Sequence, residues 1–430
     1  MSPSRPNRVG RELAVVVEGR PVGWLRSTGR SNVTLTYDIG NPHAIALSHA
    51  LPLIGRTYAG RAVNNWISRL LPDRSEVLLH WRAQYGLTRM DTFALLWHVG
   101  EDVAGAAQFV RPDRLETVAG PGTGSLRPLS DDDIAARLSA LRTDAAAWSP
   151  DSTTGQFCLA GAQAKFALAR TSTGWAIPSG AQPTTHIFKP AIPTLADQDV
   201  CEHLTMRLAA VAGMPVAPTQ VLTFAGQRAL VVTRFDRIPV HDGPGPSWRR
   251  IHQEDICQAL GLPPTCKYES LGGPGAAAVI ALLRDSVDSE HAETDVAGFV
   301  RALGFNWLVA GTDAHARNYA LLHHRQRTRL APLYDLNSFL PYQQPHAPIS
   351  LAMRVGDYQS NPAVIGAEHW KQLAGKVRLD PAAITSMLRE LGTLLLDVAP
   401  SVLVDEHSSR LPKRMRTALS KHVSACLRRL

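Results

Sequence analysis

Three polar residues have types and spacing that could carry out phosphoryl transfer. Asp313 is followed five positions later by Asn318, and Asp335 lies a short distance beyond them. In the catalytic loop of kinases, an Asp accepts the proton of the attacking hydroxyl, and an Asn and a further Asp bind Mg²⁺. The sequence therefore predicts Asp313 as the general base and Asn318 and Asp335 as metal ligands.

The segment between these residues predicts a hairpin that would bring the two metal ligands together. Residues 319–322 and 330–333 are apolar runs, and the polar residues 323–329 separate them. The midpoint of positions 318 and 335 falls in this polar turn, so we expect Asn318 and Asp335 to face one another about 5 Å apart. Amide and carboxylate oxygens suit Mg²⁺. Taken alone, the same residues would also fit an ordinary loop.

A lysine and a glutamate further upstream form a second candidate pair. Lys189 ends a mostly apolar strand expected over residues 185–190, and Glu202 lies on a helix expected over residues 200–212 and closed by Gly213. A strand Lys held by a helix Glu is how kinases fix the α- and β-phosphates of ATP. The alternative is a surface lysine with its charge in water.

Residues 157–170 contain small residues and Lys165 between two apolar runs. Small side chains would let backbone N–H groups approach phosphates closely, and Lys165 would add positive charge. The pattern matches neither a Walker loop nor a dinucleotide-binding fingerprint. An ordinary hairpin is therefore the alternative.

The elements expected around these residues would position them. A helix over residues 295–310 has its apolar side chains on one face and Gly311 as its C-cap, and it would deliver Asp313 to the site. Residues 229–236 predict a buried strand that runs into a polar turn. A helix is expected to open at residues 252–255 and to close at Gly261, and the chain beyond residue 245 is expected to be largely helical.

Length and composition indicate a globular protein of two or three domains, with 430 residues, 45% hydrophobic and 19% charged. Residues 1–110 predict a β-rich unit, with a hairpin over 13–25, a strand over 33–37 and a helix over 64–71. Residues 111–129 predict a linker, and Ser130 is expected to cap the helix that follows. No apolar run approaches the ~20 residues of a membrane span, and no signal peptide is recognisable.

The cysteine content and the net charge indicate the compartment and the kind of partner to expect. The five scattered cysteines indicate reduced thiols and a cytoplasmic protein. A net charge of +8 suggests a polyanionic partner, for example nucleic acid. Residues 410–430 are basic and contain no acid, and Met415, Leu419, Val423 and Leu427 form an apolar stripe. We favour a docked helix with solvated charges over a dedicated DNA contact.

Taken in order, these motifs resemble the HipA family of bacterial toxin kinases. Residues 70–73 resemble its N-terminal subdomain. The other matching blocks are residues 159–163 with Lys165, residues 183–187 with Lys189, and residues 234–237, 253–255, 267–269, 272–275, 312–316 with Asn318, and 334–335. Each block is a weak signal, but the ordered set is specific.

The resemblance implies an α+β fold of the bilobal, protein-kinase-like class related to lipid kinases. It would comprise a β-rich N-terminal subdomain (1–110), the linker (111–129), a kinase N-lobe (130–240) and a helical C-lobe (241–430). It also implies an ATP- and Mg²⁺-dependent serine/threonine protein kinase that is the toxin of a type II toxin–antitoxin system. The expected partners are a small helix-turn-helix, HipB-like antitoxin and operator DNA. The expected substrate is an aminoacyl-tRNA synthetase, with the glutamyl type favoured, whose phosphorylation halts translation and promotes persistence.

Position by position, the resemblance also implies the residues of the site. His315 joins Asp313 and Asn318 as a catalytic-loop residue, and the backbone of Thr233, Arg234 and Phe235 would meet the adenine. The phosphate loop and the remaining nucleotide-binding residues would be Ala160, Gly161, Ala162, Gln163, Ala164, Lys165, Lys189, Glu202, His315, Ala316, Arg317, Asn318, Tyr334 and Asp335.

The sequence departs from the family at two positions. Cys158 stands where related members have a serine whose autophosphorylation ejects the loop, and Ala164 replaces a glutamate. We therefore expect no self-inactivation, unless Ser152, Thr153 or Thr154 replaces that serine. Two other functions remain open, namely a catalytically silent subunit that binds antitoxin and operator DNA, and a small-molecule kinase of the aminoglycoside type.

Overall fold

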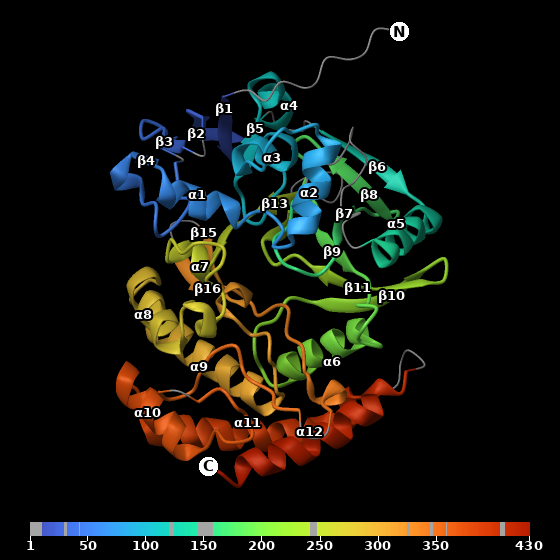
Figure 1. Cartoon of the computed structure of the whole chain (residues 1–430), viewed down its shortest axis with the longest axis vertical. Coiled ribbons are helices and arrows are strands. Elements are labelled where there is room, and N and C mark those ends of the chain that lie inside the picture. Colours follow the sequence, from blue (N-terminus) through green and yellow to red (C-terminus); the bar gives the residue numbers. More distant parts are fainter. Residues whose placement is uncertain are drawn as a thin grey trace. The chain divides into compact units, whose positions relative to one another are not determined.

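Short strands dominate the first half of the chain and long helices its last third (Figure 1). The computed structural model describes residues 11–29, 32–42, 44–119, 124–144, 158–240, 247–324, 327–344, 347–357, 359–404 and 409–430. The chain divides into two units. The first contains residues up to 190 with 222–254 and 258–264, and the second contains residues 191–221, 255–257 and 265–430. The four segments expected from the sequence, with the three boundaries between them, stay predictions.

The first unit begins with the predicted hairpin. Strand β1 (Glu12–Val17) pairs antiparallel with β2 (Arg20–Ser27), and the turn between them has Glu18 and Gly19 at φ 49° and 74°. Two successive residues with positive φ match the twist of a tight hairpin. The sheet has the order β4-β3-β2-β1-β5, with β3 at Val33–Tyr37, β4 at Thr57–Ala59 and β5 at Gln108–Val110.

Four helices and two 3₁₀ turns accompany this sheet. Helix α1 spans Arg61–Ser68, so it begins and ends three residues before the helix that the sequence predicted. Trp66 of α1 packs edge-on against Phe109 of β5 and is almost wholly buried, which anchors the helix on the sheet. The other elements are α2 (Ser75–Gln84), α3 (Thr92–Val99), α4 (Leu115–Ala119) and the 3₁₀ turns Leu53–Gly55 and Pro112–Arg114.

A second sheet of the order β10-β11-β9-β7-β8-β6 follows in the chain. Helix α5 (Asp131–Thr143) packs against β6 and β11, and it begins with the predicted cap, in which Ser130 and Asp133 bond each other's backbone. The strands are β6 (Ser125–Leu129), β7 (Phe166–Arg170), β8 (Trp175–Ser179), β9 (His186–Lys189), β10 (Thr219–Phe224) and β11 (Gln227–Thr233).

A buried group of charges, which we call the Asp102 network, joins the two sheets of this unit. Its members are Asp102, Thr184, Arg234, Asp236, Arg237 and Arg250. Arg237 contacts Asp102 at 2.8 Å, and Arg234 contacts Asp236 at 2.8 Å. Burial disfavours the ionised Asp102, but the guanidinium groups of Arg237, Arg250 and Arg234 outweigh it and hold its pKa well below the usual value. The side chains of 234–237 thus tie together segments distant in sequence.

The helix expected to open at residues 252–255 is wrong. These residues form strand β14 (His252–Asp255), and only the short α7 (Ile256–Ala259) follows. Extended backbone is favoured because the Glu254 carboxylate accepts hydrogen bonds from Ser48 Oγ at 2.6 Å and His49 N at 2.8 Å. Just before it, β12 (Arg237–Val240) pairs with β13 (Ser247–Arg250).

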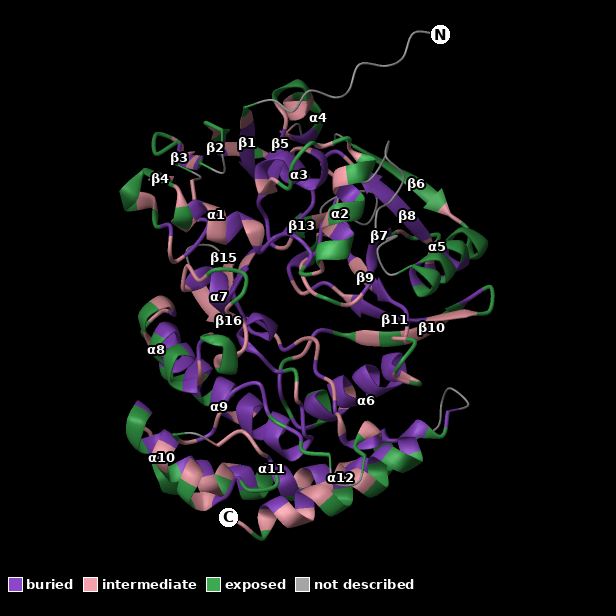
Figure 2. Cartoon of the chain, in the orientation of Figure 1, coloured by how far each residue is buried: buried purple, intermediate pink, exposed green. Residues whose placement is uncertain are grey.

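The second unit is mainly helical, as predicted. Helix α11 packs against α6, α9, α10 and α12. Figure 2 shows α12 with buried and exposed faces, and the predicted stripe Met415, Leu419 and Val423 is fully buried, with Leu427 half-buried. The helices are α6 (Gln198–Val211), α8 (Ala276–Ser286), α9 (Ala292–Leu308), α10 (Ala367–Val377), α11 (Pro381–Val402) and α12 (Leu411–Leu427), with 3₁₀ turns at Glu269–Leu271, Ala316–Asn318 and Leu340–Tyr342.

None of the described helices combines the length and the apolar character that a membrane crossing requires. All five cysteines are free thiols, and all except Cys266 are buried.

Candidate active site

Helix α9 positions the segment that begins at Asp313. Its predicted apolar face is buried, and the chain leaves the helix through a Schellman motif, in which Gly311 N donates to Asn306 O at 2.7 Å. Ala310 adopts the left-handed φ of 50°, so the helix ends earlier than predicted. A Cβ at Gly311 would lie 2.1 Å from Asn306 Oδ1, so only glycine fits here without a shift. Asp313 therefore follows a tightly defined turn.

The residues from Asp313 to Asn318 form a compact frame around one exposed carboxylate. His315 N donates to Asp313 O at 2.8 Å, and Asn318 N donates to His315 O at 2.9 Å. The Asp313 side chain is 58% exposed, whereas His315, Ala316, Arg317 and Asn318 are buried. The frame thus holds Asp313 where a substrate hydroxyl could reach it.

The Asn318 amide has a defined orientation. Its Nδ2 donates to Asp313 O at 2.7 Å, which leaves Oδ1 as the atom that can bind a cation. The amide orientation follows from this hydrogen bond. Asn318 is therefore suited to metal binding through its oxygen.

The predicted hairpin is confirmed, but its register differs from the one expected. Strand β15 (Ala320–His324) pairs with β16 (Arg327–Leu330), with Leu321 opposite Leu330. This register, continued, would place Asn318 opposite Leu333, two residues before Asp335. Strand pairing therefore does not set Asn318 against Asp335.

A different contact joins the two ends of the hairpin. Tyr334 Oη donates to Arg317 O at 2.6 Å, so the residues next to Asp335 and Asn318 touch. Burial, together with the carboxylates of Asp255 and Asp335, raises the pKa of Tyr334 and keeps this phenol protonated. Asp335 itself has a φ of 58°, which bends the chain away from strand geometry.

His315 is neutral near pH 7. Burial lowers its pKa, Lys267 acts in the same direction, and the Asp313 and Asp335 carboxylates offset this effect only in part. The separation of 3.9 Å between His315 Nε2 and Asp313 Oδ1 is therefore not an ion pair at neutral pH.

The donor atoms present fit Mg²⁺ bound together with phosphates. Among the described residues, no three His, Cys, Asp or Glu side chains gather closely enough to hold a metal ion by themselves. Mg²⁺ is often bound by one or two protein oxygens, with phosphate and water completing its coordination. Asn318 Oδ1 and the Asp335 carboxylate match that donor set.

Arg317 has a structural partner within the same unit. Its Nε lies 3.2 Å from Asp255 Oδ2, and both side chains are largely buried. The guanidinium is thus directed at Asp255, while the carbonyl of Arg317 receives the Tyr334 hydroxyl.

The segment from Ala160 to Lys165 forms a loop that closes on itself in the first unit. Lys165 Nζ donates to Ala160 O at 2.8 Å, and Gln163 Nε2 donates to Pro190 O at 3.1 Å. Gly161 has a φ of 114°, and a Cβ there would lie 2.6 Å from Lys165 Nζ. Ala162, at the tip, is exposed, whereas Ala164 is buried. The loop has the small residues and the positive charge that phosphate binding requires.

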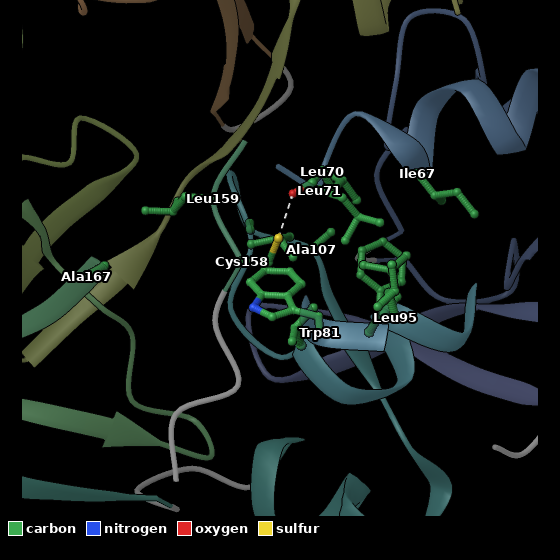
Figure 3. Packing of buried hydrophobic residues seen from close by; sticks show 14 of the residues in the cluster. Ile67, Leu70, Leu71, Trp81, Leu95, Ala107, Cys158, Leu159 and Ala167 are labelled. Atoms are coloured by element: carbon green, nitrogen blue, oxygen red, sulfur yellow. Dashed lines mark hydrogen bonds between the residues drawn. The ribbon is translucent and has the colours of Figure 1, made fainter. Parts of the chain in front are cut away.

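The N-terminal part of the chain holds this loop in place. Asp73 N donates to Gly161 O at 3.1 Å, and Cys158 N donates to Asp102 O at 2.9 Å. Figure 3 shows Cys158 among Leu71, Ala107 and Trp81, with its sulfur directed at Leu70 O at 3.1 Å. Only 1% of Cys158 is exposed, and burial raises the pKa of its thiol. Residues 70–73 thus act as a support for the loop.

The remaining predicted residues lie on the expected elements. Lys189 ends β9 and is buried, and Glu202 is buried on α6, where it accepts a hydrogen bond from Gln198 at 3.2 Å. Their pairing stays a prediction. Thr233 ends β11, Arg234 N donates to Thr185 O at 2.9 Å, and Phe235 is half-buried. The contact of this backbone with adenine also stays a prediction.

One residue at this site received no role from the sequence. Tyr268 Oη donates to Asp313 Oδ1 at 2.5 Å. Its motif, residues 267–269, contributed to the family resemblance, and that was the only signal in the sequence that could have drawn attention to it.

Comparisons with known proteins concern the whole chain and its fold. Residues 157–397 match the HipA-like C-terminal domain, and residues 13–110 match the HipA N-terminal domain. The protein Y4mE of Sinorhizobium fredii is 34% identical over 399 residues, 92% of each chain. The serine/threonine-protein kinase toxin HipA of Shewanella oneidensis is 30% identical over 322 residues, 71% of this chain and 70% of that protein.

A solved structure has the same fold. It is described as the Shewanella oneidensis toxin–antitoxin complex of HipA, HipB and operator DNA, and the matching chain superimposes with a TM-score of 0.81. The match has 24% sequence identity and covers 96% of this chain and 97% of that one. The predicted α+β, kinase-like fold class is confirmed.

Proposed function

The chain belongs to the HipA family and is a HipA-like serine/threonine protein kinase, and we propose that it is the toxin of a toxin–antitoxin pair. The toxin role is suggested by the related HipA toxin of Shewanella oneidensis, and the observation that carries the proposed phosphoryl transfer is the frame around Asp313. One exposed carboxylate lies beside an asparagine with a fixed amide oxygen, and Asp335 is adjacent in space to the same segment through Tyr334 and Arg317.

In the proposed reaction, a serine or threonine hydroxyl of a protein attacks the γ-phosphorus of ATP. The new O–P bond forms as the bond from phosphorus to the β,γ-bridging oxygen breaks, ADP leaves, and the hydroxyl proton passes to the Asp313 carboxylate. Asn318 and Asp335 would hold Mg²⁺, which neutralises phosphate charge when it is bound. Because His315 is neutral near pH 7, it adds no positive charge beside the Asp313 carboxylate.

Several further groups would hold the nucleotide. Residues Ala160 to Lys165 would hold phosphates through backbone N–H groups and the Lys165 ammonium, with Lys189 held by Glu202 as a further cation. The backbone of residues 233–235 would bind the adenine. Support for the loop's role comes from the hydrogen bonds of Lys165 and Gly161, which give the loop a defined, closed shape.

The proposed partners are a small helix-turn-helix antitoxin and, through the complex with it, operator DNA. The similar Shewanella chain was solved in a complex of HipA, HipB and operator DNA. The positive net charge of +8 is compatible with a place near DNA. Five free cysteines support work in the reducing cytoplasm.

The proposed substrate is an aminoacyl-tRNA synthetase, with the glutamyl enzyme favoured. The test incubates the protein with γ-labelled ATP, Mg²⁺ and a panel of purified synthetases, and maps the labelled residue by mass spectrometry. Label on one serine or threonine of one synthetase is the expected result. An aminoglycoside included in the same panel tests for small-molecule transfer.

Two outcomes would contradict the proposal. Label on the aminoglycoside alone would indicate a small-molecule kinase. Absence of transfer to any protein, with antitoxin and operator binding retained, would indicate a catalytically silent subunit.

A further inference from the structure

Tyr268 contacts the proposed base, and it has no role in the proposed binding of the metal or the nucleotide. Tyr268 Oη donates to Asp313 Oδ1 at 2.5 Å. Hydrogen bonds to an ionised acceptor are among the stronger ones in proteins. This contact lies within the second unit and concerns the one exposed carboxylate of the frame.

The backbone that carries Tyr268 is fixed by its own turn. Leu271 N and Gly273 N donate to Tyr268 O at 2.9 and 2.8 Å. A Cβ at Gly273 would lie 2.8 Å from both Lys267 C and Tyr268 O, so a larger residue would push the turn apart. Glu269 Oε2 accepts from Arg354 N at 2.7 Å and attaches the turn to a distant segment. The backbone of Tyr268 is therefore held in one conformation by this turn.

The ring of Tyr268 is fixed as well as its backbone. It packs edge-to-face against His315, with 4.8 Å between the ring centroids and an angle of 80° between the planes. Lys267 Nζ lies 5.2 Å from the centre of the ring. Two neighbours thus limit how far the phenol can move from Asp313.

Both rings approach the same oxygen of the base. The hydroxyl of Tyr268 donates to Oδ1, and His315 Nε2 lies 3.9 Å from that same atom. A carboxylate has lone pairs on both oxygens, so a bond to Oδ1 leaves Oδ2 able to accept another proton. The two oxygens therefore have different surroundings.

We propose that Tyr268 is a positioning residue that fixes the Asp313 carboxylate through Oδ1, so that Oδ2 is the atom that receives the proton of the substrate. This inference rests on the proposed function, because it presupposes that Asp313 is the base. An exposed carboxylate without such a bond would rotate between conformers, and misplacement by about 1 Å can cost about 100-fold in rate.

The test compares the wild type with Tyr268→Phe, Asp313→Asn and the double variant. The phenylalanine keeps the ring on His315 and removes only the hydroxyl. The assay follows label from γ-labelled ATP to the synthetase found in the panel, or to dephosphorylated casein if the panel finds none. Tyr342→Phe is the matched control, because its hydroxyl donates to Ala196 O at 3.0 Å in the same unit.

Tyr268→Phe should lower kcat about 10- to 100-fold with little change in the KM for ATP. In the Asp313→Asn background it should cause no further loss, because a group that acts through Asp313 has nothing left to position. Tyr342→Phe should transfer phosphate at the wild-type rate.

Three results would overturn the inference. Wild-type kcat in Tyr268→Phe would mean that the hydrogen bond has no role, and an equal loss in both backgrounds would mean a general structural effect. A faster Tyr268→Phe would mean that the phenol blocks the place of the substrate hydroxyl.

Other results would distinguish a failure of the proposed function. Full transfer by Asp313→Asn, or no transfer by the wild type, would refute the proposed function itself. An inactive Asp313→Asn together with a fully active Tyr268→Phe would refute only the positioning role of Tyr268.

Discussion

At the scale of single residues, two hydrogen bonds arrange the proposed base and metal ligands, one from Asn318 Nδ2 to Asp313 O and one from Tyr334 Oη to Arg317 O. The five-residue spacing predicted Asp313 and Asn318 as members of one catalytic loop, and a hydrogen bond of 2.7 Å from Asn318 Nδ2 to Asp313 O joins them. The way in which Asp335 is brought near was not predictable. It depends on a positive φ at Asp335 and on the Tyr334 hydroxyl, and neither follows from apolar periodicity.

Replacing Asp335 should affect metal-dependent nucleotide binding first. Asp335→Ala removes one of two proposed protein ligands, so the affinity for ATP in the presence of Mg²⁺ should fall by at least ~10-fold, with little change when Mg²⁺ is absent. Calorimetric titration with and without Mg²⁺ measures both values. Asp357→Ala is the control, because Asp357 pairs with Lys376 on the surface. If Asp335→Ala and the wild type bound ATP equally tightly in the presence of Mg²⁺, Asp335 would not be a metal ligand.

Cys158 stands where the family resemblance led us to expect a self-inactivating serine. Its thiol donates to Leu70 O and is buried in an apolar cluster (Figure 3), so this side chain anchors the start of the Ala160–Lys165 loop in the core. The hydroxyls considered as substitutes, Ser152, Thr153 and Thr154, lie outside the described residues.

The wild type should therefore gain no phosphate on the segment 152–158 after incubation with Mg²⁺ and ATP. Cys158→Ser should gain one phosphate and lose activity with time, because a phosphoserine adds about two negative charges that this apolar cluster cannot accept. Intact-protein mass measures the gain, and Cys266→Ser is the control at a half-buried thiol. One phosphate on the wild type, mapped to 152–158, would refute the expectation.

At the scale of elements, local patterns predicted what local forces decide. The apolar face of α9, the cap of α5 and the hairpin β1–β2 were all predictable, because periodicity and turn residues define them. Strand β14 was not, because Glu254 obtains its partners, Ser48 and His49, from a segment about 200 residues away. The Asp102 network was missed for the same reason.

That network should make a large contribution to stability. Asp102→Asn leaves the buried Arg234 and Arg237 to share Asp236 and removes the ion pair of Arg250, so the free energy of unfolding should fall by ~3–5 kcal/mol. Denaturant titration measures the change. Asp113→Asn is the control, since Asp113 is 67% exposed and its ion pair with Arg111 should contribute ~1 kcal/mol or less. Equal effects of the two substitutions would contradict a structural role for the network.

At the scale of the whole molecule, the net positive charge does not identify the surface that binds a polyanion. Helix α12 buries Met415, Leu419 and Val423. Arg416 and Lys421 on the helix and Arg428 at its C-cap are exposed, which agrees with a docked helix whose charges are solvated. Composition suggested a polyanionic partner, but it could not say which surface that partner meets, because net charge carries no position.

The exposed charges of α12 should not contribute to DNA binding. In a complex with the antitoxin and operator DNA, replacing Arg416, Lys421 and Arg428 by serine should leave the slope of log K against log salt unchanged. Binding measured between about 50 and 200 mM salt gives this slope. Each phosphate that the variant no longer neutralises would reduce the slope by ~0.9, so a decrease of ~2 to 3 would show that the helix contacts the phosphates.

We propose that Asp313 takes the proton of a protein hydroxyl during phosphoryl transfer from ATP. The most direct measurement is the rate of γ-phosphate transfer to protein by Asp313→Asn and by the wild type, with ATP affinity measured in parallel. Asparagine keeps an oxygen for the Tyr268 hydrogen bond but cannot act as a base. We expect kcat to fall ~10²–10⁴-fold while ATP affinity is largely kept. Transfer by Asp313→Asn at the wild-type rate would show that Asp313 is not the base.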